Sequence, residues 1–223
     1  MSVQVLESPR SHPSESVKRL LQSSTATNVV GRPFRVVSLL SGGIDSSTLL
    51  YWLKHQGYEV KALTIIYGQR HEREIYAARK IAYEANVEWK LIDISGVRLV
   101  LRSALTSEDI PVPEVPEDAQ YHEALKSTVV PNRNMIFLSI AAAWAASMDY
   151  DAVAYAAHWS DRGVYPDCRE EFVEAIEKAL RLSLDHPGFR VLAPFVRYSK
   201  AEIVALGSSL GVPYEYTLSL IHI

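Results

Sequence analysis

The chain has 223 residues, of which 48% are hydrophobic and 22% are charged, and its formal net charge is −3. This composition is typical of a globular protein large enough to bury a core as one domain, and it excludes a largely disordered chain. The small negative charge gives no sign of a general attraction to nucleic acid or to a membrane surface, and no apolar stretch is long enough to span a bilayer. The single cysteine, Cys168, excludes an internal disulfide.

Residues 1–32 are rich in Ser, Arg, Thr and Pro, and they lack the apolar core of a secretory signal. We therefore expect a disordered N-terminal extension of a cytoplasmic protein, followed by one α/β domain at residues 33–217. A small anionic substrate suits this composition better than a polymer, so neither nucleic acid nor a membrane is expected as a direct partner.

The most informative segment reads Ser-Gly-Gly-Ile-Asp-Ser-Ser at residues 41–47. It follows an apolar run at 34–40 and precedes a helical pattern, so a strand is expected to lead through a glycine turn into a helix. Glycines can take positive backbone angles, and the serine hydroxyls lie beside the exposed N–H groups of the helix terminus. Such a loop is suited to phosphate oxygens, and the residues expected to hold the nucleotide are Leu40, Ser41, Gly42, Gly43, Ile44, Asp45, Ser46 and Ser47.

Asp45 distinguishes this loop from a Walker-type motif, which carries a lysine followed by serine or threonine. A carboxylate beside a phosphate is repulsive unless a cation bridges the two, so Mg²⁺ shared between Asp45 and the nucleotide is predicted. The pattern resembles the pyrophosphate loop of the N-type ATP pyrophosphatases, which make adenylates and release pyrophosphate. The alternative interpretation is a glycine-rich turn with solvated serines.

Helices and strands alternate after the loop. The first helix is expected to end at Gly57, and a buried strand follows at 60–67. An amphipathic helix at 71–86 then leads to a short strand at 89–94. This alternation predicts an open, mostly parallel α/β sheet of the Rossmann-like kind, with helices on both faces. Residues 107–121 combine prolines with acidic residues and predict a flap or mobile loop.

The second half of the chain continues the pattern. A helix poor in charge is expected at 135–148, buried on most sides, and a strand follows at 151–157. Two further helices are expected, the second ending at Gly211. Their starts are predicted by the capping-box pairs Asp167 with Glu170 and Ser199 with Glu202.

Polar residues follow the end of the second predicted strand, in the run Tyr67-Gly68-Gln69-Arg70-His71. Arg70 could clamp a carboxylate or a phosphate through two hydrogen bonds, and His71 could move a proton near neutral pH. The alternative is a solvated helix start.

Two more polar clusters stand at predicted helix starts. Arg133 and Asn134 precede a buried helix, where Asn132 or Asn134 could instead serve only as a cap. A longer cluster at 158–169 follows a strand end, and there Cys168 could be only a small buried side chain. Ligands bind at the carboxyl edge of open α/β sheets, so the common placement of these clusters favours one shared pocket.

The motifs SGGIDSS, YGQRH, VPNRNMIFLSIA and YPDCREEF occur in this order along the chain. In order and approximate spacing they are similar to the 7-cyano-7-deazaguanine synthases of the QueC family, from about Arg35 to Thr217. The resemblance implies a ligase that converts 7-carboxy-7-deazaguanine and ammonia to the nitrile with ATP and Mg²⁺, on the route to queuosine and related deazaguanines. It implies an adenylated acid and then an adenylated amide as intermediates, and it leaves a homodimer open.

The resemblance also implies roles for individual residues. Asp45, Arg70, His71 and Arg133 would be the catalytic group, as contacts to anions or to the transition state. An acidic side chain would suit the N–H edge of a deazaguanine. The residues implied to bind the substrate are Tyr67, Gln69, Asn134, Asp161, Tyr165, Asp167, Cys168 and Arg169.

The chain departs from the family pattern after Thr217. Family members continue with further cysteines, which hold a structural Zn²⁺ through four thiolates, whereas residues 218–223 read Leu-Ser-Leu-Ile-His-Ile. No family-type zinc site is therefore expected. The run LSLIHI matches the translation of a common transposon-end sequencing adapter, which predicts a non-native tail at 218–223 in place of the zinc-binding part. The alternative is a genuine short apolar tail.

A second departure is the run His158-Trp159-Ser160, where many members carry a different polar sequence; it could mark altered base selectivity or a role in DNA modification. Two other functions are compatible with the motifs. One is another adenylating enzyme with this loop, either tRNA-modifying or amide-forming, although a tRNA thiolase normally needs more cysteines than this chain has. The other is a nucleotide-binding homologue that has lost turnover.

Overall fold

The computed structural model describes residues 15–22, 31–68, 72–101, 103 and 126–218. Its centre is a sheet of five parallel strands in the order β3-β2-β1-β4-β5. This confirms the predicted open parallel sheet, although β5 was not among the expected strands. The strands are β1 (Arg35–Leu39), β2 (Glu59–Ile66), β3 (Glu88–Asp93), β4 (Ala152–Ala154) and β5 (Arg190–Leu192).

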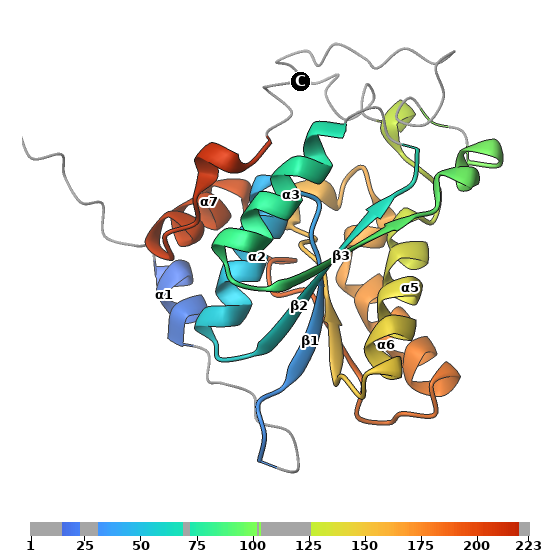
Figure 1. The fold of residues 1–223 in the computed structure, drawn as a ribbon, viewed down its shortest axis with the longest axis horizontal. Helices are drawn as coiled ribbons and strands as arrows, with labels where there is room; N and C mark the ends of the chain where they lie inside the picture. The colour runs from blue at the N-terminus through green and yellow to red at the C-terminus, as the bar shows by residue number, and fades with distance from the viewer. Residues whose placement is uncertain (1–14, 23–30, 69–71, 102, 104–125, 219–223) are drawn as a thin grey trace, which may run out of the picture.

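Helices cover both faces of the sheet, as predicted. α5 and α6 pack on one face, while α2 and α3 pack on the other with α7 outside α2 (Figure 1). Among the described residues, no helix combines the length and the apolar character that crossing a membrane requires. The α-helices are α1 (Glu15–Gln22), α2 (Ile44–His55), α3 (Glu72–Glu84), α5 (Arg133–Ser147), α6 (Glu170–Ser183) and α7 (Lys200–Ser209).

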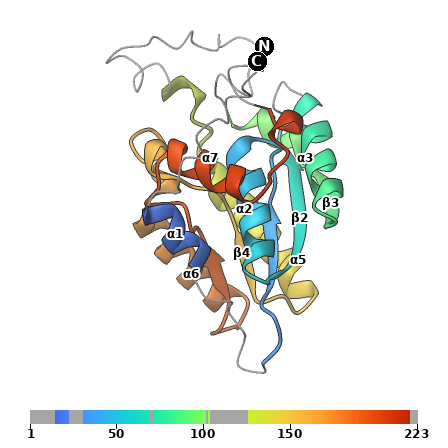
Figure 2. The same ribbon diagram turned by 90° about the vertical axis from the view of Figure 1, so that its left-hand side faces the viewer.

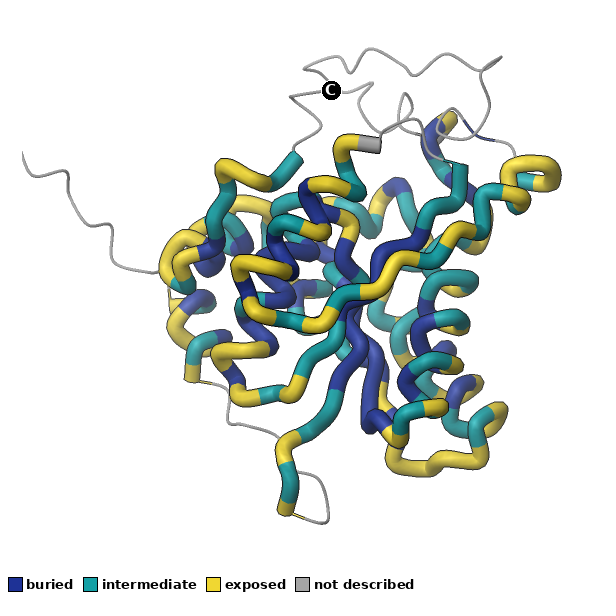
Figure 3. Tube along the Cα trace, viewed as in Figure 1, coloured by how far each residue is buried: buried dark blue, intermediate teal, exposed yellow. Residues whose placement is uncertain are grey.

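The strands are buried on both sides, which explains their almost continuous apolar sequences. In β1 successive side chains point to opposite faces: Val37 packs in the cluster that contains α5, and Val36 packs in the cluster that contains α2 and α7. Figure 3 shows the central strands as the most deeply buried part of the molecule. The core therefore lies in two layers separated by the sheet.

The order of the strands reverses next to β1. Val37 of β1 pairs with Lys61 of β2 on one side and with Val153 of β4 on the other. The strands β2 and β3 thus lie on one side of β1, and β4 and β5, which come later in the sequence, lie on its other side. In sheets of this kind the carboxyl ends of the two strands at the reversal open a crevice for ligands. Residues 41–47 and 158–169 follow those two strand ends.

Residues Glu15–Gln22 lie within the segment for which disorder was expected, but they form α1. Val17 and Leu20 are buried against α2 and α7, and α1 lies beside α7 in both views (Figures 1 and 2). The expectation of disorder therefore does not hold for these residues. Residues 1–14 and 23–30, and the flap expected at 107–121, lie outside the described residues.

The two predicted capping boxes have different outcomes. At α7 the box is present, because Ser199 Oγ accepts from the Glu202 N–H and Glu202 Oε2 accepts from the Ser199 N–H at 2.9 Å. At α6 the predicted box is wrong, since no side chain caps the helix. Asp167 Oδ2 accepts instead from the N–H of Asn134 at 3.1 Å, at the start of α5. A capping pattern along the chain does not reveal that the acceptor serves a helix from another part of the sequence.

Candidate active site

The loop between β1 and α2 has the predicted strand-turn-helix geometry. Gly42 has a φ of 84°, whereas Gly43, the N-cap residue of α2, has a φ of −82°, so only the first glycine takes a positive angle. A Cβ atom at Gly42 would lie 2.5 Å from the Glu74 carbonyl oxygen, because α3 packs directly on this turn. The N–H of Leu218, the first residue of the expected tail, donates to the Gly42 carbonyl at 3.0 Å.

The serines of the loop bind the loop itself. Ser46 Oγ lies 3.0 Å from Ser41 Oγ and donates to the Gly43 carbonyl at 3.1 Å, and Ser47 Oγ donates to the same carbonyl at 2.8 Å. Leu40 is buried below the turn, and its N–H donates to Leu63 of β2. These bonds fix the first turn of α2, where Ile44 to Ser46 contribute N–H groups that have no partner within the helix. A fixed helix N-terminus of this kind suits phosphate oxygens.

Asp45 lies in a cluster of charged groups that come from three different elements. Its Oδ2 atom accepts a hydrogen bond from Lys200 Nζ, in the first turn of α7, and lies 3.7 Å from His158 Nε2, which follows β4. The same His158 nitrogen lies 3.3 Å from Asp161 Oδ2. The strand reversal therefore brings the loop, the residues after β4 and the start of α7 into one site.

Two atoms of this cluster are buried without a hydrogen-bond partner among the described residues, Asp45 Oδ1 and His158 Nδ1. Burial raises the pKa of the Asp161 carboxyl above its ordinary value; the nearby His158 opposes this shift and the nearby Asp45 adds to it. Two partly buried carboxylates thus lie beside one buried imidazole. Such an arrangement favours an additional cation or proton among them.

Lys200 is the functional candidate that sequence reasoning missed, because a lysine after a helix cap looks like any solvated helix start. His158 belongs to the predicted polar cluster at 158–169, but its position beside Asp45 was not predicted. The signal that could have found Lys200 is its position after β5, a third strand that ends at the same edge of the sheet. Because β5 has only three residues, that signal was not visible in the sequence.

A second group of predicted residues meets at the start of α5. The Arg133 guanidinium lies 5.6 Å from the ring centre of Tyr165, whose hydroxyl is 2.8 Å from Thr128 Oγ1. Burial alone would lower the pKa of Arg133, but Tyr67 and then Asp167 raise it above its ordinary value, so the guanidinium stays charged. The favourable effect of this guanidinium on the Asp161 carboxylate links the second group to the cluster around Asp45.

Asn134, Asp167 and Cys168 form the wall beside Arg133. Asn134 donates through its backbone N–H to Asp167 and through its side-chain amide to Cys168 Sγ at 3.6 Å. Cys168 is buried, and burial raises the pKa of its thiol to about 12, with Asp161 and Asp167 adding to the shift. The thiol therefore contributes shape and a weak hydrogen bond to this wall and does not supply a thiolate.

We expect Cys168 to resist alkylation in the native protein. A raised pKa leaves the thiol protonated below that pKa, so at pH 8 only about one thiol in 10,000 is ionised if the pKa is about 12. Iodoacetamide labelling followed by intact-mass spectrometry measures the rate, and the urea-unfolded chain is the control. Because the chain has a single cysteine, the readout is unambiguous. Equal labelling rates in the native and unfolded protein would contradict the described burial.

Not every predicted residue joins these two groups. Arg169 is exposed, and its Nε donates to the carbonyl of Arg162 at 3.0 Å, which ties it to the loop after β4. Gln69, Arg70 and His71 lie outside the described residues, so their predicted roles stay predictions. The structure thus gathers Asp45, Asp161, Arg133 and the residues around Asn134 at one edge of the sheet.

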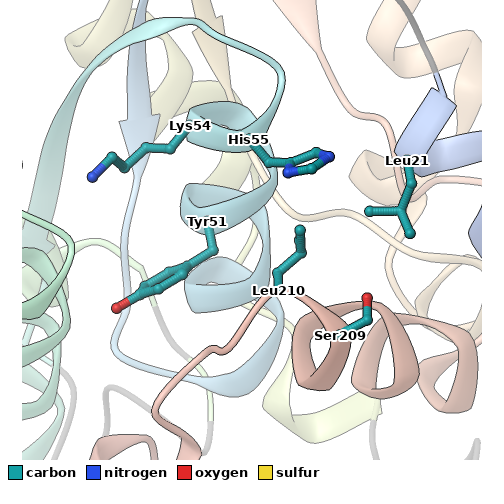
Figure 4. A pocket seen from close by; sticks show the side chains of 6 residues that line it. All are labelled: Leu21, Tyr51, Lys54, His55, Ser209 and Leu210. Atoms are coloured by element: carbon teal, nitrogen blue, oxygen red, sulfur yellow. The ribbon is translucent and has the colours of Figure 1, made fainter.

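A hollow of about 540 Å³ lies elsewhere, at the C-terminal ends of α2 and α7 (Figure 4). Asp45 stands near the other end of α2, and a rise of about 1.5 Å per residue places it roughly 15 Å away. This hollow is therefore separate from the cluster at the strand ends. The residues that line it are Leu21, Tyr51, Lys54, His55, Ser209 and Leu210.

Comparisons with known proteins cover the part of the chain that contains these residues. The family model described as queuosine biosynthesis protein QueC matches residues 35–221. A 7-cyano-7-deazaguanine synthase of Archaeoglobus fulgidus is 52% identical over 186 residues, which cover 83% of this chain and 76% of that protein. A protein of the same name from Caldicellulosiruptor bescii is 46% identical over 185 residues, which cover 83% of this chain and 82% of that protein.

Among solved structures, an NMN synthetase from Francisella tularensis superposes with a TM-score of 0.54 at 16% identity, covering 92% of this chain and 73% of that one. At this identity the likeness concerns the fold alone. It supports the description of the chain as an open parallel sheet with helices on both faces.

Proposed function

Since this chain belongs to the family of the queuosine biosynthesis protein QueC, we propose that it is an ATP-dependent ligase that converts 7-carboxy-7-deazaguanine and ammonia to 7-cyano-7-deazaguanine. The observation that carries this proposal is the meeting of the SGGIDSS loop with Lys200, His158 and Asp161 at the strand reversal. Cytoplasmic location, a homodimer and the absence of a direct nucleic-acid partner stay predictions.

The first step activates the carboxylate of the substrate, which is a poor electrophile because its charge repels nucleophiles and its oxygen leaves badly. A carboxylate oxygen attacks the α-phosphate of ATP, the bond to the β-phosphate breaks, and pyrophosphate leaves. The N–H groups at the start of α2 and the Lys200 ammonium, which binds Asp45 in the first turn of α2, would stabilise the negative charge that develops on the pyrophosphate. Fixed donors aimed at developing charge stabilise a transition state without reorganisation.

The residues at the loop fit a magnesium ion. Asp45 Oδ1 is a buried carboxylate oxygen without a hydrogen-bond partner among the described residues, which is the kind of ligand that Mg²⁺ prefers. When bound, Mg²⁺ would neutralise the charge between this carboxylate and the phosphate oxygens. In the part of the chain that the structure describes, no group of three or more His, Cys, Asp or Glu forms a metal centre. Magnesium needs none, because it is usually held by one or two carboxylates together with substrate phosphates.

The second group of residues would bind the base. The charged Arg133 suits the carboxylate of the substrate before activation, and Asp161, whose Oδ2 lies 3.3 Å from His158 Nε2, is an acidic neighbour of both groups. Asp167 already accepts from the backbone of α5, so Asp161 is the more available acceptor for the N–H edge of the base.

Ammonia then attacks the acyl carbon, AMP leaves and a proton is released, which gives the amide. The amide oxygen attacks the α-phosphate of a second ATP and pyrophosphate leaves. Loss of AMP and of the two N–H protons then leaves the nitrile. One site must therefore carry out two adenylations in succession.

Incubation of the full chain with 7-carboxy-7-deazaguanine, ammonium and MgATP tests the proposal. Mass spectrometry should detect the nitrile, with two AMP and two pyrophosphate released for each nitrile formed. Without ammonium, base-dependent exchange of labelled pyrophosphate into ATP should persist while the nitrile disappears. Absence of both the nitrile and the base-dependent exchange would contradict the proposal.

A further inference from the structure

The N-terminal helix α1 lies outside the residues that the family model matches, yet it contacts the first turn of α7. We propose that α1 is a positioning element of the active site, which holds the first turn of α7 and thereby keeps Lys200 against Asp45. This inference rests on the proposed function, because it presumes that the Lys200 ammonium acts in adenylation.

The apolar face of α1 fixes the helix over both α2 and α7. Val17 is fully buried and Leu20 is nearly so. They belong to one apolar cluster with Trp52 of α2 and with Ile203 and Leu206 of α7. Because the two partner helices carry Asp45 and Lys200 in their first turns, α1 spans the pair of elements that forms the ion pair.

The C-terminal end of α1 is bound to α2 by two buried hydrogen bonds. Trp52 Nε1 and Gln56 Nε2 both donate to the Leu20 carbonyl, at 2.9 Å and 3.1 Å. The carbonyls of a last helical turn have no partner within their own helix, so these donors satisfy one of them. Two side chains converging on one oxygen fix where α1 stands along α2.

The N-terminal end of α1 is bound to the capping box of α7. Ser16 Oγ donates to Glu202 Oε1, while Glu202 Oε2 accepts from the Ser199 N–H. These bonds keep the pKa of Glu202 below its ordinary value, and the bond from Ser16 makes the largest contribution. Lys200 lies between the two capping residues in sequence, so the orientation of its side chain follows the geometry of this turn.

The contacts thus form a continuous path from α1 to the phosphate loop. Ser16 binds Glu202, Glu202 and Ser199 cap α7, and Lys200 in the capped turn binds Asp45. A helix that only covered apolar surface would stabilise the fold without changing the rate of the folded enzyme. A positioning helix affects the rate through Lys200.

Point variants in the full chain separate these roles. Leu20→Ala and Ser16→Ala weaken the two attachments of α1, Ser16→Thr keeps the hydroxyl, and Lys18→Ala on the exposed side is the matched control. Base-dependent ATP–pyrophosphate exchange is measured well below the melting temperature of each variant, where all are folded. We expect kcat to fall between about 2-fold and about 30-fold for the two weakening variants, the range of coupling through a packed element, with KM for ATP nearly unchanged. Ser16→Thr and Lys18→Ala should retain the wild-type kcat.

The same substitutions in a Lys200→Ala background complete the test. If α1 acts through Lys200, Leu20→Ala and Ser16→Ala should cause no further loss once the lysine is gone. An undiminished effect in that background, or weakening variants that match Lys18→Ala, would overturn the role of α1 and leave the proposed function intact. Wild-type turnover by Lys200→Ala would overturn the role of the lysine and of α1 together. Lack of base-dependent exchange in the unsubstituted protein would overturn the proposed function itself.

Discussion

Replacing Asp45 with asparagine is expected to lower the rate of base-dependent ATP–pyrophosphate exchange by about 100-fold to 1000-fold, the loss found when a group that stabilises transition-state charge is removed. The substitution keeps the shape of the side chain but replaces the carboxylate that faces Lys200 and fits Mg²⁺ with a neutral amide, which retains only one oxygen. Initial rates at saturating ATP and base give the comparison.

The fold of the Asp45→Asn variant should survive. Desolvation and the charge of Asp45 both raise the pKa of the partly buried Asp161, so loss of the Asp45 charge relieves a repulsion and partly offsets the lost ion pair with Lys200. The melting temperature should stay within about 4 °C of the wild type, which corresponds to roughly 1 kcal/mol in a chain of this size. Asp185→Asn, an exposed residue with a φ of 49° that asparagine accepts, is the matched control. Normal exchange by Asp45→Asn would contradict the assignment of the loop.

Replacing Gly42 with alanine is expected to destabilise the fold by about 2–4 kcal/mol, combining an unfavourable backbone conformation with an overpacked contact. The added Cβ would lie 2.5 Å from the Glu74 carbonyl and 2.7 Å from the Ala78 N–H nitrogen, and both are backbone atoms of α3. Either the loop or the helix must move, so nucleotide binding should be lost together with stability. Urea unfolding followed by tryptophan fluorescence measures the change.

Gly43→Ala is the matched control for this prediction. Gly43 has a negative φ, and its added Cβ would lie no nearer than 3.4 Å to any neighbour, which is ordinary contact. Its cost should stay below about 1 kcal/mol, since glycine and alanine differ modestly at a helix N-cap. Equal destabilisation by the two substitutions would show that the close packing of α3 on the loop is not what requires Gly42.

The sequence carries clear information about the fold wherever local patterns determine it. The apolar run before Ser41 and the helical spacing after it predict β1 and α2 within two residues of their observed bounds. The three-residue strand β5 offers no period to detect, and α1 lies in a segment whose Ser and Pro content is typical of disorder. The apolar face of α1 is buried only because α2 and α7 lie beside it, and no local sequence pattern reveals that placement.

The candidate site also contains residues that the sequence identifies and contacts that it does not reveal. Asp45 is identifiable because glycines, hydroxyls and a carboxylate coincide at one junction. Arg133 is identifiable because polar residues precede a buried helix, and Asp161 because a polar cluster follows a strand end. The positions of Lys200 and His158 beside Asp45 depend on the strand order, which sequence periodicity does not determine. Asp167 illustrates the opposite error, because a pattern typical of a local cap serves a helix that is distant in sequence.

The pairing of β1 with β4 also has a consequence for the order of folding. The N–H of Arg35 binds Asp151 across 116 residues of sequence, whereas β1, β2 and β3 follow one another closely. Long-range pairing is slow because the intervening chain must first be closed, so the first three strands can associate before β4 joins them. A nascent chain that ends before Lys200 carries the whole phosphate loop but lacks the ammonium group that binds Asp45. The ion pair between Lys200 and Asp45 can therefore form only in the nearly complete domain.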